Sequence, residues 1–256
     1  MPKVNLEQIL ACPNCKTSLN PKGKSGKCPN CRFAYSKENG IWRLLLLKSK
    51  RGKYSKESYD STHLKSFRGP SDGSYEILAS FARGNKTLDI ACGQGHIEKL
   101  APNTVGVEFS DNALKIAQKN GARHLVLADA HALPFKNNSF DLSISSGNLE
   151  HFANPQKAIQ EMARISKIQV LTVHRHPPIP GAVIIHKLIT ILFGIKHQPI
   201  ERPMSERAVV NMLEKANLHV VFRGVWTIPI NYGRVIKFLP EFKNIPACTF
   251  VISVKK

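Results

Sequence analysis

Six cysteines occur in the chain, and four of them stand near the N-terminus as two Cys-x-x-Cys pairs. Cys12 and Cys15 form the first pair, Cys28 and Cys31 the second, with 12 residues between the pairs. Each pair can aim two thiolates at one ion, so together they supply the four ligands of a tetrahedral Zn²⁺ site. Four thiolates leave no open position for water, so the sequence predicts a structural zinc rather than a catalytic one. Unliganded or redox-active cysteines and an iron–sulfur cluster are alternatives that fit the spacing less well.

A second group of residues begins inside the short, mostly apolar run at 86–91 and continues past its end. Asp89, Ala91, Gly93 and Gly95 form the pattern D-x-A-x-G-x-G between an expected strand and an expected helix. Glycines at such a turn let the backbone approach a ligand closely at the carboxyl edge of a parallel sheet. The pattern departs from G-x-G-x-x-G, so a dinucleotide fingerprint is not indicated.

Two acidic residues end the next two expected strands. Glu108 closes the apolar run 104–108, where the sheet-edge rule places an acid that binds ribose hydroxyls. The alternative for Glu108 is an acid at the start of a helix. Asp129 closes the third strand, and a carboxylate there can accept a hydrogen bond from an exocyclic amine.

Residues 84–167 together resemble the class I S-adenosylmethionine (SAM)-dependent methyltransferases, and most closely the type 11 group. In that family the glycine turn packs on the cofactor, the second-strand acid binds ribose, and the Asp before Leu-Pro-Phe binds adenine. The cofactor-binding residues that this resemblance implies are Asp89, Ala91, Gly93, Gly95, Glu108, Asp129, Ala130 and Ser146. The chain departs from the family at 165–169, which has no glycine where a Lys-Pro-Gly-Gly turn is common.

The cysteine segment carries a resemblance of its own. Residues 4–47 resemble the small zinc-ribbon proteins that partner and activate RNA and protein methyltransferases. Trp42 departs from that pattern, because a proline is common at its position. A cysteine-paired ribbon also resembles the N-terminal module of a bacterial ribosomal-RNA guanine methyltransferase.

Strands and helices alternate from about residue 74 onward, which predicts a parallel α/β sheet. The expected strands are 86–91, 104–108, 125–128, 140–145, 168–173, 219–222 and 249–254. We therefore expect a Rossmann-like, seven-stranded, doubly wound sheet with a small N-terminal zinc ribbon. The expected organisation is a ribbon at 1–47, a basic linker and lead-in at 48–73, and a methyltransferase domain at 74–256. A cap insertion is expected near 177–203, with its apolar part at 181–195.

The charge is uneven along the chain, whose formal net charge is +19. Residues 1–70 carry +11, residues 71–170 are neutral, and residues 171–256 carry +8. Basic flanks of this kind favour a polyanionic partner such as RNA, although solvated lysines that only keep the protein in solution are the alternative. No apolar run reaches about 18 uncharged residues and no secretory leader is visible, so we expect a cytoplasmic protein without a transmembrane helix.

The methyl acceptor is the least defined part of this interpretation. Ser146, His151 and His174 follow strands at the expected acceptor edge, and they are the candidate catalytic residues. The sequence predicts methyl transfer from SAM to an unidentified acceptor, with RNA favoured by the basic flanks and the ribbon. A small lipophilic or anionic metabolite is an alternative acceptor, and a catalytically silent zinc-ribbon docking protein is an alternative class. The oligomeric state does not follow from the sequence.

Overall fold

The computed structural model describes residues 4–47, 56–61, 73–175, 200, 202–230 and 242–256. Its helices are α1 (Leu6–Ile9), α3 (Ser74–Ala82), α4 (His96–Leu100), α5 (Asp111–Lys119), α6 (Pro155–Ile165) and α8 (Glu206–Lys215), with 3-10 turns η1 (Ala130–Ala132) and η2 (Leu149–His151). Its strands are β1 (Ser25–Lys27), β2 (Ala34–Glu38), β3 (Ile41–Arg43), β4 (Thr87–Ile90), β5 (Val105–Glu108), β6 (His124–Leu127), β7 (Phe140–Ser146), β8 (Ser166–His174), β9 (Leu218–Ile230) and β10 (Phe242–Lys255). Residues 56–61 add one short helical segment.

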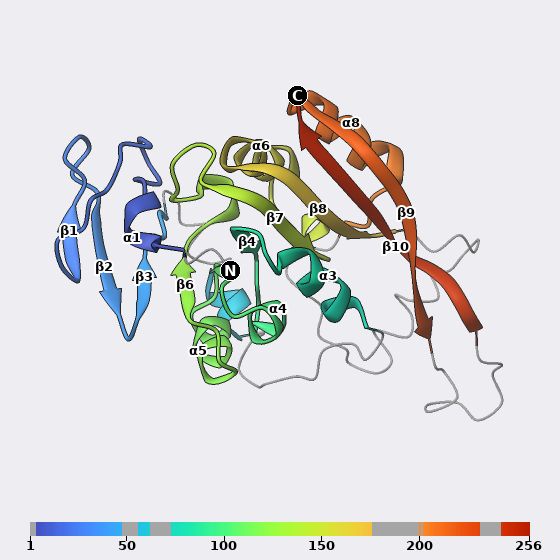
Figure 1. The fold of residues 1–256 in the computed structure, drawn as a ribbon, viewed down its shortest axis with the longest axis horizontal. Helices are drawn as coiled ribbons and strands as arrows, with labels where there is room; N and C mark the ends of the chain where they lie inside the picture. The colour runs from blue at the N-terminus through green and yellow to red at the C-terminus, as the bar shows by residue number, and fades with distance from the viewer. Residues whose placement is uncertain (1–3, 48–55, 62–72, 176–199, 201, 231–241) are drawn as a thin grey trace.

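All of these strands form one sheet in the order β1-β2-β3-β6-β5-β4-β7-β8-β10-β9 (Figure 1). Strands β4 to β8 run parallel, and β10 is antiparallel to both β8 and β9. The chain proceeds from β4 to one side through β5 and β6, and then returns to the other side of β4 at β7. The expected seven-stranded doubly wound sheet is thus confirmed in β4–β10, and its switch point lies between β4 and β7.

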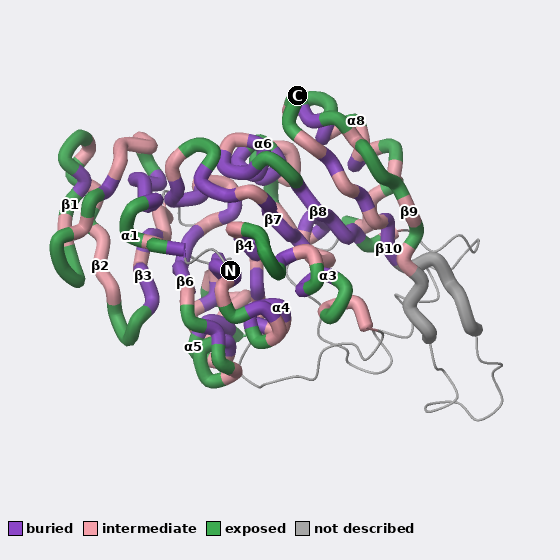
Figure 2. The backbone as a smooth tube through the Cα atoms, in the orientation of Figure 1, coloured by how far each residue is buried: buried purple, intermediate pink, exposed green. Residues whose placement is uncertain are grey.

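Both faces of the central strands are covered (Figure 2). On β8, Val170 packs in one cluster with α3 and α4, whereas its neighbours Leu171 and Val173 pack in another with α6 and α8. Successive side chains of a strand point to opposite faces, so a strand covered on both faces is apolar at most of its positions. This explains the short continuous apolar runs in the sequence.

Helix starts follow the capping residues of the sequence. Ser110 accepts a hydrogen bond from the backbone N–H of Ala113 at the start of α5. Asn154 accepts from the N–H of Lys157 at the start of α6, where a proline occupies the first position. Each cap satisfies an N–H that has no partner within its helix.

The zinc-ribbon segment continues the sheet at the free edge of β6. β3 pairs with β6 in parallel, with Trp42 opposite Val126, and Leu10 forms an antiparallel bridge with Phe135. Trp42 is fully buried, in the same hydrophobic cluster as the face of the sheet covered by α6. Ribbon and α/β domain therefore share one core in this structure.

The C-terminal strands differ most from expectation. β9 and β10 span 13 and 14 residues, much longer than the expected strands at 219–222 and 249–254. Their pairing shifts register between Pro246 and Cys248 and again between Ile252 and Ser253. These irregularities break the two-residue alternation that marks a strand in a sequence. The apolar part of the cap near 177–203, and most of the linker 48–73, lie outside the described residues.

No helix among the described residues is long and apolar enough to cross a membrane.

Candidate functional site

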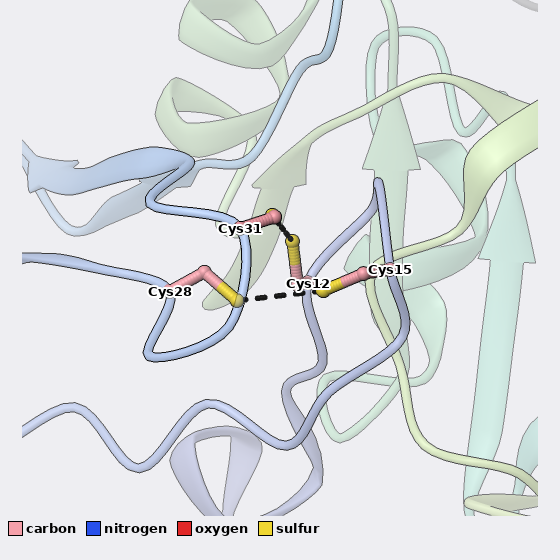
Figure 3. Close-up of side chains that lie close together, drawn as sticks. All are labelled: Cys12, Cys15, Cys28 and Cys31. Atoms are coloured by element: carbon pink, nitrogen blue, oxygen red, sulfur yellow. Dashed lines mark hydrogen bonds between the residues drawn. The ribbon is translucent and has the colours of Figure 1, made fainter.

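The four N-terminal cysteines converge, as Figure 3 shows. The sulfurs of Cys12 and Cys31 lie 3.5 Å apart, as do those of Cys15 and Cys28, and all four lie within 4.8 Å of one another. A tetrahedral ion with Zn–S bonds of about 2.3 Å separates its sulfurs by about 3.8 Å, so the four residues fit zinc. None of the four forms a disulfide.

The two halves of this site have the same backbone turn. Lys16 donates its N–H to the carbonyl of Cys12, and Arg32 donates to the carbonyl of Cys28, at 2.9 and 3.0 Å. Both donors have a φ of +61°, which turns the chain back after each pair. Burial raises the pKa of the Cys12 thiol to about 12, so in the absence of metal this cysteine stays protonated. A bound cation reverses that preference, because it favours the thiolate.

The glycine turn follows β4 and uses left-handed backbone at Ala91, Gly93 and Gly95. A side chain at Gly93 would meet nothing within 4 Å, and this residue faces a pocket. A Cβ at Gly95 would lie 2.9 Å from the Cβ of Ala117 on α5. Gly95 is therefore needed for the close approach of the turn to α5, and it lies outside the pocket wall.

The pocket next to this turn has a volume of about 460 Å³. It lies at the carboxyl ends of β4, β5, β6 and β7, around the switch point of the sheet, where such folds bind ligands. Of the residues expected to bind the cofactor, its wall contains Asp89, Ala91, Gly93, Glu108, Asp129, Ala130 and Ser146.

Glu108 holds the turn and the next loop together. Its carboxylate accepts hydrogen bonds from the N–H groups of Gly93 at 3.0 Å, Phe109 at 2.6 Å and Ser110 at 2.8 Å. The acid at the end of β5 is thus fixed by backbone donors, with its oxygens at the pocket wall. An oriented carboxylate of this kind can accept further hydrogen bonds from a pair of ligand hydroxyls.

Asp129 is oriented by its neighbour His131. Its carboxylate accepts from the N–H of His131 at 2.9 Å and from Nδ1 of the same ring at 2.5 Å. The N–H of Asn154 donates to Nε2 of that ring, so the proton of a neutral ring lies on Nδ1. Burial opposes ionisation of Asp129, but the hydrogen bonds from His131 outweigh it and lower the pKa of this carboxyl.

Two carboxyl groups lie buried beneath the turn. Glu98 on α4 is fully buried, and its burial raises its pKa to about 8. Burial and the neighbouring Glu98 also raise the pKa of Asp89. Burial therefore disfavours the charged form of both acids.

The three candidate catalytic residues meet at the opposite side of the pocket, at the ends of β7 and β8. Ser146 Oγ accepts a hydrogen bond from Thr172 at 3.3 Å. His151 Nδ1 lies 2.6 Å from the carbonyl oxygen of Ile200, and His174 Nδ1 bonds to a carboxylate oxygen of Glu150. Hydrogen bonds with Cys248 and Glu150 raise the pKa of His174 to about 10.

Sequence reasoning missed several residues here. Glu150 is fully buried behind the two histidines, and its position next to His151 was the signal that could have found it. Asn148 donates its side-chain amide to the carbonyls of Ile90 and Ala91 at 3.1 and 3.2 Å. Tyr59 reaches across from the lead-in helix to the carbonyl of His151 at 3.0 Å. No local pattern around Tyr59 predicts that contact.

Residues 88–171 match the sequence family described as a methyltransferase domain. A demethylmenaquinone methyltransferase of Paenarthrobacter aurescens is 33% identical over 105 residues, which cover 38% of this chain and 42% of that protein. The tRNA (carboxymethyluridine(34)-5-O)-methyltransferase of Schizosaccharomyces pombe is 29% identical over 92 residues, covering 35% and 40%. The chain thus spans less than half the length of these curated relatives.

Solved structures extend the likeness of fold over most of the chain. A SAM-dependent methyltransferase of Thermotoga maritima, described as a possible histamine N-methyltransferase, gives a TM-score of 0.58 at 20% identity, covering 80% of this chain and 97% of its own. The complex between the Haloferax volcanii Trm112 methyltransferase activator and the putative methyltransferase gives 0.55 at 16% identity, covering 82% and 99%.

The sheet order and these structural matches show the fold of the chain, which is the Rossmann-like fold of the class I SAM-dependent methyltransferases. In sequence, residues 88–171, about a third of the chain, are the part that matches the methyltransferase-domain family.

Proposed function

We propose that this chain catalyses methyl transfer from SAM to an acceptor bound at the ends of β7 and β8. The observation that carries the proposal is the convergence of Asp89, Gly93, Glu108 and Asp129 on one pocket at the switch point. Transfer from a sulfonium is an in-line displacement, and the cofactor brings its own activation. The residues therefore act by aligning the acceptor, the methyl group and the sulfur.

Each residue has a role that follows from its place. Glu108 accepts hydrogen bonds from the two ribose hydroxyls. Asp129 accepts a hydrogen bond from the adenine amine, and the backbone of Ala130 lies beside the adenine. The left-handed turn at Gly93 gives room for the methionine part of the cofactor. Ser146, at the end of β7, faces the methyl group and the acceptor.

The ribbon, in this proposal, is a structural element that acts within the chain. Residues 4–47 resemble a zinc-ribbon activator, and here β3 already pairs with the edge strand β6. Lys16 of the ribbon also binds Glu161 of α6 at 2.6 Å. We propose that the ribbon stabilises the domain by covering this edge, so that no separate ribbon protein binds there.

We propose RNA as the acceptor class. Three lysines of the ribbon, Lys22, Lys24 and Lys27, are exposed and make no ion pair with the described residues. They belong to the flank of residues 1–70 that carries +11, and one relative is named as a tRNA methyltransferase. A phosphate backbone gives such a surface sequence-independent affinity.

A small lipophilic acceptor is the second candidate, because part of the pocket wall is aromatic or apolar. Phe152, Ile200 and Trp226 line it, and another relative is named as a demethylmenaquinone methyltransferase. A ligand of this kind would be held by apolar burial and would need no charged flank.

Charge reversal separates the two acceptors. Changing Lys22, Lys24 and Lys27 to Glu should weaken RNA binding. The remaining binding should depend less on salt, because a protein that contacts fewer phosphates releases fewer counterions. The matched control changes three exposed lysines of the neutral segment, Lys99, Lys115 and Lys119, to Glu. SAM affinity should stay the same in both variants. Equal RNA binding and methylation in both would contradict the RNA proposal.

A further inference from the structure

A second group of metal-ligating side chains lies apart from the cysteines. Glu150, His151 and His174 each place one ligand atom within 4.8 Å of the others. Glu150 and His151 belong to the turn η2 after β7, and His174 ends β8, so all three meet at the carboxyl edge of the sheet. Both histidines line the pocket at its acceptor side.

The carboxylate of Glu150 has one oxygen in use and one without a partner. Oε1 accepts from the backbone N–H of His174 at 3.1 Å and from Nδ1 of that ring. Oε2 has no solvent contact and no hydrogen bond to any described residue, and the whole residue is 0% exposed. A buried polar atom without a partner destabilises the folded state, and it does so more strongly where it is charged. A cation beside Oε2 would remove that destabilisation.

His151 is oriented as metal-binding histidines are. Its Nδ1 can only donate to the carbonyl oxygen of Ile200, which lies 2.6 Å away, so in the neutral ring Nε2 carries a free lone pair. Nε2 lies 4.0 Å from Oε1 of Glu150. A histidine ligand commonly donates its second ring N–H to a carbonyl, which fixes the ring toward the ion.

We infer that Glu150, His151 and His174 bind one divalent transition-metal ion, distinct from the ribbon zinc, with open coordination positions toward the pocket. Two imidazoles and one carboxylate suit Zn²⁺, Mn²⁺ or Fe²⁺, and three protein ligands leave room for a further oxygen. The cysteine site differs, because its four sulfurs fill a tetrahedron.

The use of this ion rests on the proposed function. An acceptor hydroxyl bound to the metal loses its proton to solvent at a lower pH than a free hydroxyl. Its oxygen lone pair then forms the bond to the methyl carbon of SAM, while the S–CH₃ electron pair passes to sulfur and leaves S-adenosylhomocysteine. The acceptor class that the site favours is accordingly one that reacts through oxygen.

Zinc titration of the full chain tests the inference. Protein with its ribbon loaded should take up a second equivalent of Zn²⁺, measured by competition with a chromophoric chelator. Glu150→Gln and His174→Ala should each weaken this second equivalent by about tenfold or more, the scale seen even for outer-shell changes at metal sites. His131→Ala, which removes a pocket histidine outside the group, should keep it.

A cofactor readout distinguishes this inference from the proposed function. The Glu150→Gln and His174→Ala variants should bind SAM as tightly as the unchanged protein does, because neither residue is among those expected to bind the cofactor. If the unchanged protein binds SAM but holds only the ribbon zinc, Glu150 and His174 form an ion pair only and the metal inference is overturned. If the unchanged, metal-loaded protein does not bind SAM, the proposed function is overturned instead.

Discussion

The shared core predicts that a substitution inside the ribbon destabilises the ribbon and the α/β domain together. Trp42→Ala removes a fully buried side chain that packs where β3 meets β6. Truncating a buried aromatic residue to alanine costs about 3–5 kcal/mol through lost burial and a residual cavity. For a chain of this size that corresponds to a Tm lower by roughly 6–20 °C.

The assay follows two signals in one thermal or denaturant transition. Circular dichroism reports the helices of the α/β domain, and a zinc-sensitive dye reports release of the ribbon metal. Both signals should change at one midpoint, and Trp42→Ala should lower that midpoint for both. Phe222→Ala on β9, where the ring is 50% exposed, is the control and should have a much smaller effect. Two separate transitions, with only the zinc signal shifted by Trp42→Ala, would refute the reasoning.

Three further results are expected. Cys12→Ser should release zinc and lower the midpoint of domain unfolding as well, so a domain midpoint that stays in place would speak against the shared core. Gly95→Ala should destabilise the protein by about 1–3 kcal/mol more than Gly84→Ala, because both residues have positive φ but only Gly95 faces another side chain. The raised pKa of Glu98 makes the folded state bind a proton that the unfolded state releases above its ordinary pKa near 4.5, so stability should fall as pH rises from about 5 to 8. Glu98→Gln should flatten that pH profile of the unfolding free energy in urea titrations. An equally steep profile in the variant would show that other groups cause the pH dependence.

Much of the fold follows from local patterns. Strands β4 to β8 are short apolar runs between helix caps such as Ser110 and Asn154, and these signals act over a few residues. The predicted residues that line the candidate cofactor pocket follow for the same reason. The topology of a parallel sheet brings the carboxyl ends of its strands to one edge. The glycine turn, Glu108 and Asp129 each follow one such strand, so they are expected to meet there.

Contacts between distant segments do not follow from such patterns. Trp42 pairs with Val126, and Tyr59 reaches His151, through contacts that no spacing in the sequence encodes. Glu150 was missed because a lone acid in a turn reads as solvated until its burial is known. Strands β9 and β10 were predicted, but too short, because the bulges near Cys248 interrupt their alternation.

The most direct test of the central claim is a calorimetric titration of the full, zinc-loaded chain with SAM. We expect one SAM per chain, and we expect Glu108→Gln to bind it roughly 10- to 150-fold more weakly, the equivalent of about 1.5–3 kcal/mol for a hydrogen bond to a charged group. The variant keeps the shape of the side chain, but its amide nitrogen cannot accept a hydrogen bond from the backbone N–H groups that Glu108 binds. Its Tm is therefore compared with that of the unchanged protein to show that the turn is intact. Absence of SAM binding in folded, unchanged protein would contradict the account and favour a docking protein without catalysis.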